Sequence, residues 1–170
     1  MLGALAGGRD ILQPLAHLRV ANSAVPAGAV GTVTLDSVVH FERIASVDDL
    51  NARLRNTGGR PVMLDFYADW CISCKEMERF TFSDVGVQKR LAKFVLLKAD
   101  VTANSDDDKA LLKRFSLFGP PGIVFFDARG HEIDGLRVIG FEEAERFSAI
   151  LDRAANVKSN NVADRDVKYH

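Results

Sequence analysis

Cys71 and Cys74 are the only cysteines of this chain, and they lie in the stretch Trp-Cys-Ile-Ser-Cys-Lys of residues 70–75. Two thiols at this spacing suit thiol–disulfide exchange, in which one thiolate attacks a partner's sulfur and the second thiol resolves the mixed disulfide. A helix that began at the first cysteine would favour its thiolate through unpaired N–H groups and the helix dipole. We therefore predict Cys71 as the attacking thiol and Cys74 as the resolving thiol.

Two other interpretations of the pair remain. A structural zinc site needs four ligands, whereas this chain offers one cysteine pair and four scattered histidines without zinc-finger spacing. A purely structural disulfide between residues so close would remove little entropy from the unfolded chain. We expect no metal, and no cofactor beyond a redox-active disulfide between Cys71 and Cys74.

The elements around this pair must position it. Residues 62–67 form a near-continuous apolar run after Pro61, with the length of a buried central strand. A helix is predicted to begin at about Cys71, to break or kink near residues 81–84 and to continue through Leu91. The cysteine pair would therefore lie where a buried strand passes into a helix.

The rest of the central region alternates strands and helices. Ser46 is a predicted N-cap of a helix that Gly58 and Gly59 would end. Further strands are predicted at residues 38–44, 94–99, 123–126 and 133–139, the last two joined by a hairpin turn, and a closing helix at residues 141–154. This order indicates an α/β protein with a mixed central sheet flanked by helices.

One further helix is predicted after Asn104 and Ser105, which would cap it. Its acid-rich first turn, residues 106–108, is interpreted as solvated, because the helix dipole favours negative charge there. Its predicted core face consists of Ala110, Leu111, Leu112 and Phe115.

Length and composition indicate one globular domain with two tails. The chain has 170 residues, 47% of them hydrophobic and 26% charged, with a net charge of -1, a balance that gives no reason to expect a nucleic-acid partner. We predict a flexible tail at residues 1–36 with a short helix near residues 11–20, a domain at 37–155 and a flexible tail at 156–170. No apolar run is long enough to span a membrane. The short apolar stretch of residues 1–8 lacks the basic start of a signal peptide, and the end of a membrane segment is its alternative interpretation.

Several separate motifs resemble a known family. Residues 64–75 resemble the active-site strand and helix of thioredoxins, and residues 118–126 resemble the thioredoxin loop whose cis proline faces the disulfide. Residues 67–76, 81–84 and 101–104 are similar to the C-terminal domain of the DsbD family of thiol:disulfide interchange proteins. The resemblance extends from about Phe41 to Leu151 and implies a thioredoxin-like fold.

The resemblance also implies a role for individual residues. Cys71 would form the mixed disulfide and Cys74 would resolve it. Asp65 matches the buried acid of the strand, Glu78 matches a second acid near the cysteines, and Pro121 matches the cis proline. The loop reads Gly-Pro-Pro-Gly rather than a Gly-x-Pro-Thr type, which leaves two prolines as candidates, although the register favours Pro121.

Two aromatic residues are candidates for contact with a partner. The resemblance implies that Trp70 flanks the reactive sulfur. Its alternative interpretation is simple packing in the core. Phe118 is expected to line a docking surface beside the cis-proline loop, together with Pro121. Phe66 and Tyr67 are expected in the core.

The acids bear on the direction of electron flow. A carboxyl group in an apolar strand is costly unless it has a partner or a task, so Asp65 is either a hydrogen-bonded core acid or the proton acceptor of Cys74. Nearby negative charge disfavours a thiolate and raises the pKa of Cys71, and neither histidine nor lysine lies between the cysteines. A poorly stabilised thiolate makes the reduced pair a ready electron donor, so we predict a reductant rather than an oxidant.

The resemblance implies a protein-disulfide reductase that relays electrons from a membrane-embedded thiol pair to a periplasmic partner. Its partners would be the membrane domain and the N-terminal domain of a parent protein. The resemblance implies that such a domain lies on the periplasmic side of the bacterial inner membrane. It also implies a link with cytochrome c biogenesis. The chain itself is expected to be soluble and monomeric. The alternatives are a free-standing thioredoxin-like reductase of general substrates and a binding module without enzymatic activity.

Overall fold

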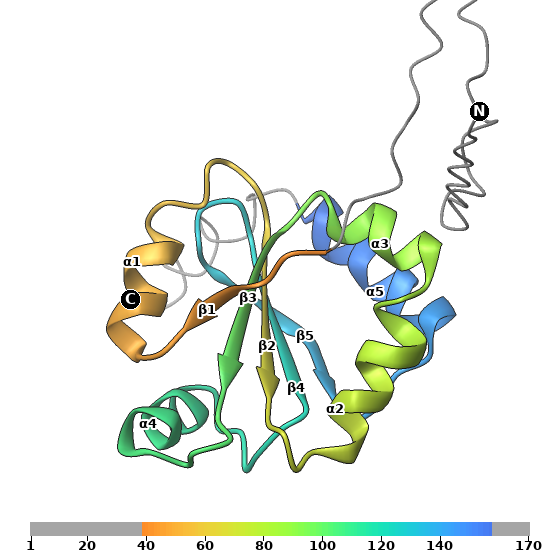
Figure 1. Cartoon of the computed structure of the whole chain (residues 1–170). Coiled ribbons are helices and arrows are strands. Elements are labelled where there is room, and N and C mark those ends of the chain that lie inside the picture. Colours follow the sequence, from red (N-terminus) through yellow and green to blue (C-terminus); the bar gives the residue numbers. More distant parts are fainter. Residues whose placement is uncertain (1–38, 158–170) are drawn as a thin grey trace, which may run out of the picture. The chain divides into compact units, whose positions relative to one another are not determined.

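A computed structural model describes residues 39–157 of the chain (Figure 1). The predicted tail at residues 1–36, with its short helix, lies outside the described residues, as does the predicted tail at 156–170 except for Asn156 and Val157. Asn156 still belongs to the last helix. The proposed domain boundaries remain predictions.

Five strands form one mixed sheet in the order β1-β3-β2-β4-β5. Their bounds are β1 Glu42–Ile44, β2 Val62–Tyr67, β3 Val95–Asp100, β4 Gly122–Phe126 and β5 Glu132–Ile139. Strands β1, β3 and β2 run parallel, whereas β4 and β5 are antiparallel to their neighbours. The central strand β2 is buried along almost its whole length, as its apolar run predicts, and the α/β prediction is confirmed.

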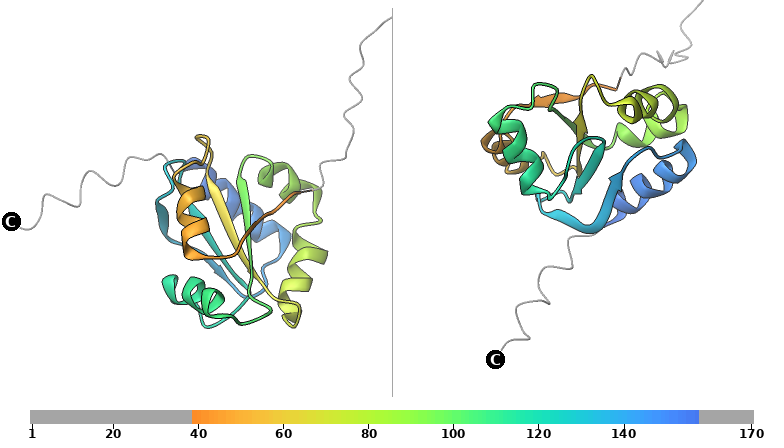
Figure 2. Two further views of the ribbon diagram at one scale, coloured as in Figure 1. Left: turned by 60° about the vertical axis from the view of Figure 1, so that its left-hand side comes forward. Right: turned by 90° about the horizontal axis from the view of Figure 1, so that it is seen from below.

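Helices cover both faces of the sheet (Figure 2). Their bounds are α1 Val47–Leu54, α2 Ile72–Glu76, η1 Met77–Thr81, α3 Val85–Leu91, α4 Asp106–Arg114 and α5 Ala144–Asn156, where η1 is one π-helical turn. One apolar cluster joins the sheet to α1 and α4. A second cluster joins the other face to η1, α3 and α5.

The alternation of side chains along β2 decides which layer each residue faces. Leu64 and Phe66 belong to the cluster beneath α1 and α4, whereas Met63 belongs to the cluster beneath α3 and α5. Because successive side chains of a strand point to opposite faces, Asp65 shares the face of Met63. Lys98, opposite Asp65 in the parallel β2–β3 pairing, lies on the same face.

Three predicted boundaries are wrong for local reasons. Of the predicted strand at 38–44, residue 38 lies outside the described residues, and β1 begins only at Glu42, while Val39 and Phe41 pack against the second cluster outside the strand. Helix α1 ends at Leu54, before the two predicted glycines, which instead adopt positive φ angles in the following turn. Helix α5 begins at Ala144 rather than 141, because η1 holds Glu142: Thr81 Oγ1 donates to its carbonyl oxygen at 2.5 Å.

The predicted core face of α4 needs one correction. Ala110 is exposed, and Asp108 is buried instead. The buried stripe runs through Asp108, Leu111 and Phe115, at the three- and four-residue steps of one helical face. Asp108 is therefore not solvated; its carboxylate accepts from the backbone N–H of the N-cap Ser105 at 2.8 Å.

Candidate redox site

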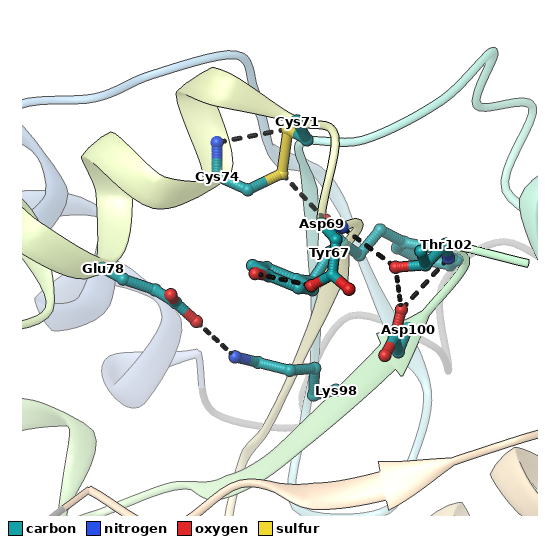
Figure 3. Close-up of polar contacts among 9 residues, drawn as sticks. Tyr67, Asp69, Cys71, Cys74, Glu78, Lys98, Asp100 and Thr102 are labelled. Atoms are coloured by element: carbon teal, nitrogen blue, oxygen red, sulfur yellow. Dashed lines mark hydrogen bonds and ion pairs between the residues drawn. A yellow bond between two sulfur atoms is a disulfide. The ribbon is translucent and has the colours of Figure 1, made fainter.

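The cysteine pair lies at the junction between β2 and α2 (Figure 3). The chain leaves β2 after Tyr67 and turns at Ala68, whose carbonyl oxygen accepts from Cys71 N at 3.0 Å. Cys71 is the N-cap of α2, and its Sγ accepts from Cys74 N at 3.1 Å. The two sulfurs form a disulfide with an S–S distance of 2.09 Å. The predicted strand-to-helix junction is thus present at the cysteine pair.

Both cysteines are largely buried in this oxidised state. Cys71 is 6% exposed and Cys74 is 4% exposed, so only a small part of the disulfide is open to a partner. The Cys74 Sγ atom lies 3.9 Å from the carbonyl oxygen of Phe66. In the reduced protein, a Cys74 thiol at this place can donate to that oxygen.

The cis-proline loop meets the same end of the sheet. The bond between Pro120 and Pro121 is cis, so the cis residue is the one that the register favours. Gly122 follows it and pairs with Phe66 of β2, which brings the loop beside the strand that leads to the cysteines. A Cβ at Gly122 would lie 2.9 Å from a methyl carbon of Leu117, so the leucine side chain would have to shift to admit a side chain there.

Exposed apolar side chains surround this end of the sheet. Trp70 is 60% exposed, which excludes the core-packing interpretation, and Phe118 is fully exposed. Ile72, at the start of α2, is exposed as well. Ile139 is exposed and pairs with Gly122, next to the cis proline. We call Trp70, Ile72, Phe118 and Ile139 the apolar rim.

Asp65 is a buried acid, as predicted, with a strongly perturbed pKa. Burial raises the pKa of Asp65 to about 7; the positive charge of Lys98 opposes this rise and the negative charge of Glu78 adds to it. Glu78 extends from η1 and its carboxylate pairs with the Lys98 ammonium at 2.6 Å (Figure 3). A group with this pKa can take up or release a proton near neutral pH.

Lys98 is a residue of the site that the sequence analysis missed. Its ammonium also lies 4.7 Å from the ring centre of Tyr67 and 4.9 Å from that of Phe41, in the range of cation–π contacts. Tyr67 is half-buried and packs against the edge of the first apolar cluster, whereas Phe66 is fully buried in it. The available signal was a lysine interrupting the apolar run of β3, but its neighbour Asp65 emerges only from the strand pairing.

A second missed residue is Thr102, in the loop after β3. It belongs to a network that also includes Tyr67, Asp69 and Asp100 (Figure 3). The hydrogen bonds that Asp100 accepts from Thr102 hold the pKa of that carboxyl below its usual value. Burial and a hydrogen bond to Asp69 raise the pKa of Tyr67. The network connects the segment just before Cys71 to the neighbouring loop.

The described part of the chain offers neither a metal cluster nor a membrane-spanning helix. Among residues 39–157, no group of three or more histidine, cysteine or carboxylate side chains could hold a metal ion. Within the same residues, no helix has the length and apolar character needed to cross a membrane.

Comparison with known proteins shows the family to which the chain belongs. A family model of the thioredoxin-like domain matches residues 50–155, and the chain belongs to this family. The thioredoxin of Thermus thermophilus, for example, has 25% identity and a TM-score of 0.57, with 76% of this chain and 98% of that chain covered.

Within the family, the chain is similar to the C-terminal domain of DsbD. The crystal structure of that domain from Neisseria meningitidis in the oxidised form has 35% identity and a TM-score of 0.56, with 66% of this chain and 99% of that chain covered. The thiol:disulfide interchange protein DsbD of Ralstonia nicotianae is 54% identical over 156 residues, which cover 91% of this chain and 24% of the relative. DsbD of Escherichia coli is 52% identical over 124 residues, or 73% of this chain and 22% of the relative. The chain therefore spans about a quarter of the length of these relatives.

Proposed function

We propose that this chain is the electron-relaying thiol–disulfide exchange domain of a DsbD-type protein. Its reduced cysteine pair passes two electrons to a disulfide in a periplasmic partner domain and is reduced again by a membrane-embedded thiol pair. The observation that carries the proposal is the Cys71–Cys74 disulfide at the start of α2, in a chain 54% identical to a thiol:disulfide interchange protein. The periplasmic location and the two partner domains rest on this similarity.

The exchange proceeds in two balanced steps. The Cys71 thiolate attacks one sulfur of the partner's disulfide, and the other partner sulfur leaves as a thiolate that takes up a proton. Cys74 then loses its proton and attacks Cys71 Sγ, which releases the partner's second sulfur as a thiolate. The partner ends as a dithiol, and this chain ends as the Cys71–Cys74 disulfide.

Asp65 is the proposed proton acceptor in the second step. Its pKa of about 7 leaves a large fraction of the carboxylate free to accept a proton at neutral pH. It is adjacent in β2 to Phe66, whose carbonyl oxygen lies 3.9 Å from Cys74 Sγ. Glu78 acts more remotely: burial raises the pKa of Asp65, and the charge of Glu78, whose carboxylate is paired with Lys98, adds to that rise.

The proposed docking surface is the apolar rim with Pro121. Exposed Trp70 and Phe118 supply the large, rigid contact area that is typical of interface anchors. A partner segment that carries its disulfide between these side chains would bring one sulfur to Cys71 and exclude water from the exchange. A rim of this kind suits the selection of a folded partner domain, whereas a small disulfide would gain little from it.

Trapping of the partner tests the exchange activity. The Cys74→Ser variant should accumulate a mixed disulfide through Cys71, because the resolving thiol is gone, and the matched Cys71→Ser variant should accumulate none. The partners should be detected by non-reducing gels and mass spectrometry after expression within the full-length parent protein. A binding module would keep its partner non-covalently in both variants. Trapping of many unrelated proteins, without the membrane domain, would favour the general reductase instead.

The reduction potential tests the direction of electron flow. Equilibration of the Cys71–Cys74 pair against glutathione or dithiothreitol buffers should give a value at or below roughly −200 mV, in the range of glutaredoxins and thioredoxin. A value near about −120 mV would mark a strong oxidant and reverse the proposed direction. If no two-electron transition were measured, the structural interpretation of the cysteine pair would replace the redox one.

A further inference from the structure

The segment that presents the reactive cysteine has little support of its own. Asp69 and Trp70 lie between the end of β2 and Cys71, outside any helix or strand, and both are exposed. Trp70 nevertheless provides the largest side chain beside the disulfide. Its orientation must be held by contacts from elsewhere in the chain, and those contacts come from Thr102.

Thr102 holds this segment through both its hydroxyl and its backbone. The backbone N–H of Asp69 donates to Thr102 Oγ1 at 2.9 Å, and the indole N–H of Trp70 donates to the Thr102 carbonyl oxygen at 3.3 Å. The Thr102 hydroxyl in turn donates to Asp100 Oδ1 at 2.5 Å, and the same oxygen accepts from Thr102 N at 3.0 Å. Figure 3 shows the contacts that connect Asp69, Thr102 and Asp100.

The arrangement depends on a hydroxyl at position 102. The carboxylate of Asp100 can only accept, so it directs the hydroxyl proton toward itself and leaves the oxygen's lone pairs for Asp69 N. A hydroxyl can donate and accept at once, which neither an apolar side chain nor an ammonium can do. Valine has nearly the same shape as threonine and can make neither contact of the hydroxyl. The Trp70 indole would then bond to the carbonyl of a loop that is no longer tied to Asp69 N, so its position would be less fixed.

We propose that Thr102 is a positioning residue that orients Trp70 and the backbone leading to Cys71 for the docking of a protein partner. This inference rests on the proposed exchange function and deepens it. A side chain that is ordered before docking loses less entropy when the partner binds. Thr102 therefore affects exchange with a folded partner, while a small thiol or disulfide that needs no docking surface reacts at its usual rate.

The test compares Thr102→Val with the matched control Thr102→Ser. Trp70 is the only tryptophan of the chain, so fluorescence quenching by acrylamide, measured on the reduced protein, reports on it alone. The valine variant should show about twofold stronger quenching and about tenfold slower reduction of insulin disulfides, through the lost pre-organisation. Oxidation of the same variant by glutathione disulfide should stay within about twofold of the unsubstituted protein, because that small reagent needs no docking surface. The serine variant should match the unsubstituted protein in all three measurements.

Three results would overturn the proposal. The first is unchanged quenching of Trp70 in Thr102→Val. The second is an equal loss of rate with insulin and with the small reagent. The third is a serine variant as impaired as the valine variant. If Thr102→Val fails to fold, Asp100→Asn must strengthen the quenching of Trp70, because it keeps the threonine and weakens the acceptor of its hydroxyl. Failure of the unsubstituted protein to reduce insulin would count against the proposed function alone, since the quenching still decides the role of Thr102.

Discussion

Three carboxyl groups of the described structure are buried to a similar degree, and they fall into two kinds. Asp108 and Asp127 are 7% and 6% exposed, and Asp65 is 5% exposed. Asp108 accepts from the Ser105 backbone N–H and completes a capping box at the start of α4. Asp127 accepts from the backbone N–H groups of Arg129 and His131 at 2.8 and 3.0 Å in the β4–β5 turn, and the exposed His131 imidazole lies 3.8 Å from its other oxygen.

Asp65 differs because burial raises its pKa to about 7, and because its neighbouring charges belong to ionisable side chains. Lys98, opposite it in the strand pairing, opposes the rise, and Glu78 of η1 adds to it. Backbone N–H groups cannot change their charge, whereas a lysine–glutamate pair can be altered by a partner or by solvent. The comparison teaches that burial of an acid does not mark a functional site by itself. What compensates the buried charge distinguishes a structural acid from one that can exchange protons.

The largest expected effect concerns stability and pH. The pKa of Asp65 is raised from 3.8 to about 7 in the folded protein, so the unfolded chain loses this proton first as the pH rises. The contribution of Asp65 to the free energy of unfolding is therefore full below pH 3.8 and falls until about pH 7, by on the order of 4 kcal/mol. Asp65→Asn should remove this dependence, so that the variant gains stability relative to the unsubstituted protein as the pH rises. Urea unfolding at several pH values measures the difference.

The matched control for this prediction is Asp127→Asn. Its carboxylate is held by two backbone N–H groups, so the substitution should lower stability at pH 7 rather than raise it. If both variants gained stability from pH 4 to pH 7, the distinction between the two kinds of buried acid would be wrong.

The next effect concerns the rate of exchange. Asp65→Asn should slow the resolution of the mixed disulfide by about 10²-fold at pH 7, because a positioned general base contributes about that much or more. The attack of Cys71 on a partner should change less, since that step does not need the Cys74 proton. Rapid-mixing kinetics with a fluorescent disulfide substrate separates the two steps. Equal slowing of both steps would contradict the role of Asp65 as proton acceptor.

A smaller effect is expected at the capping box. Asp108→Ala removes the acceptor of Ser105 N and should lower the free energy of unfolding by about 1 kcal/mol, the usual contribution of a helix cap. Exchange should be unchanged, since α4 begins at Asp106 and contributes no side chain to the proposed proton transfer. Thermal unfolding and insulin reduction measure the two properties, and a loss of exchange without a loss of stability would contradict this assignment.

Local patterns in the sequence were sufficient for much of the site. The cysteine pair, the buried strand before it and the break in the helix after it follow from spacing, apolar runs and turn residues. Lys98 and Thr102 could not be assigned in this way, because their partners lie 20 and 33 residues away in the sequence and meet them only through the tertiary fold. The helix α4 shows a similar limit: its acid-rich start predicts a solvated turn, but the capping box places Asp108 on the buried stripe.

The smallest expected effect is also the most direct test of what surrounds Asp65. The positive charge of Lys98 lowers the pKa of Asp65 and the negative charge of Glu78 raises it, so Lys98→Met should raise this pKa and Glu78→Gln should lower it. Each shift should be about half a unit to one unit, as expected for neighbouring charges near the surface. The two charges form an ion pair, and loss of either leaves the other uncompensated, which strengthens each shift in its own direction. Carbon-13 NMR titration of the Asp65 carboxyl measures both variants. Shifts of the same sign would show that the substitutions act through changed burial of Asp65, and the electrostatic distinction from Asp108 and Asp127 would then fail.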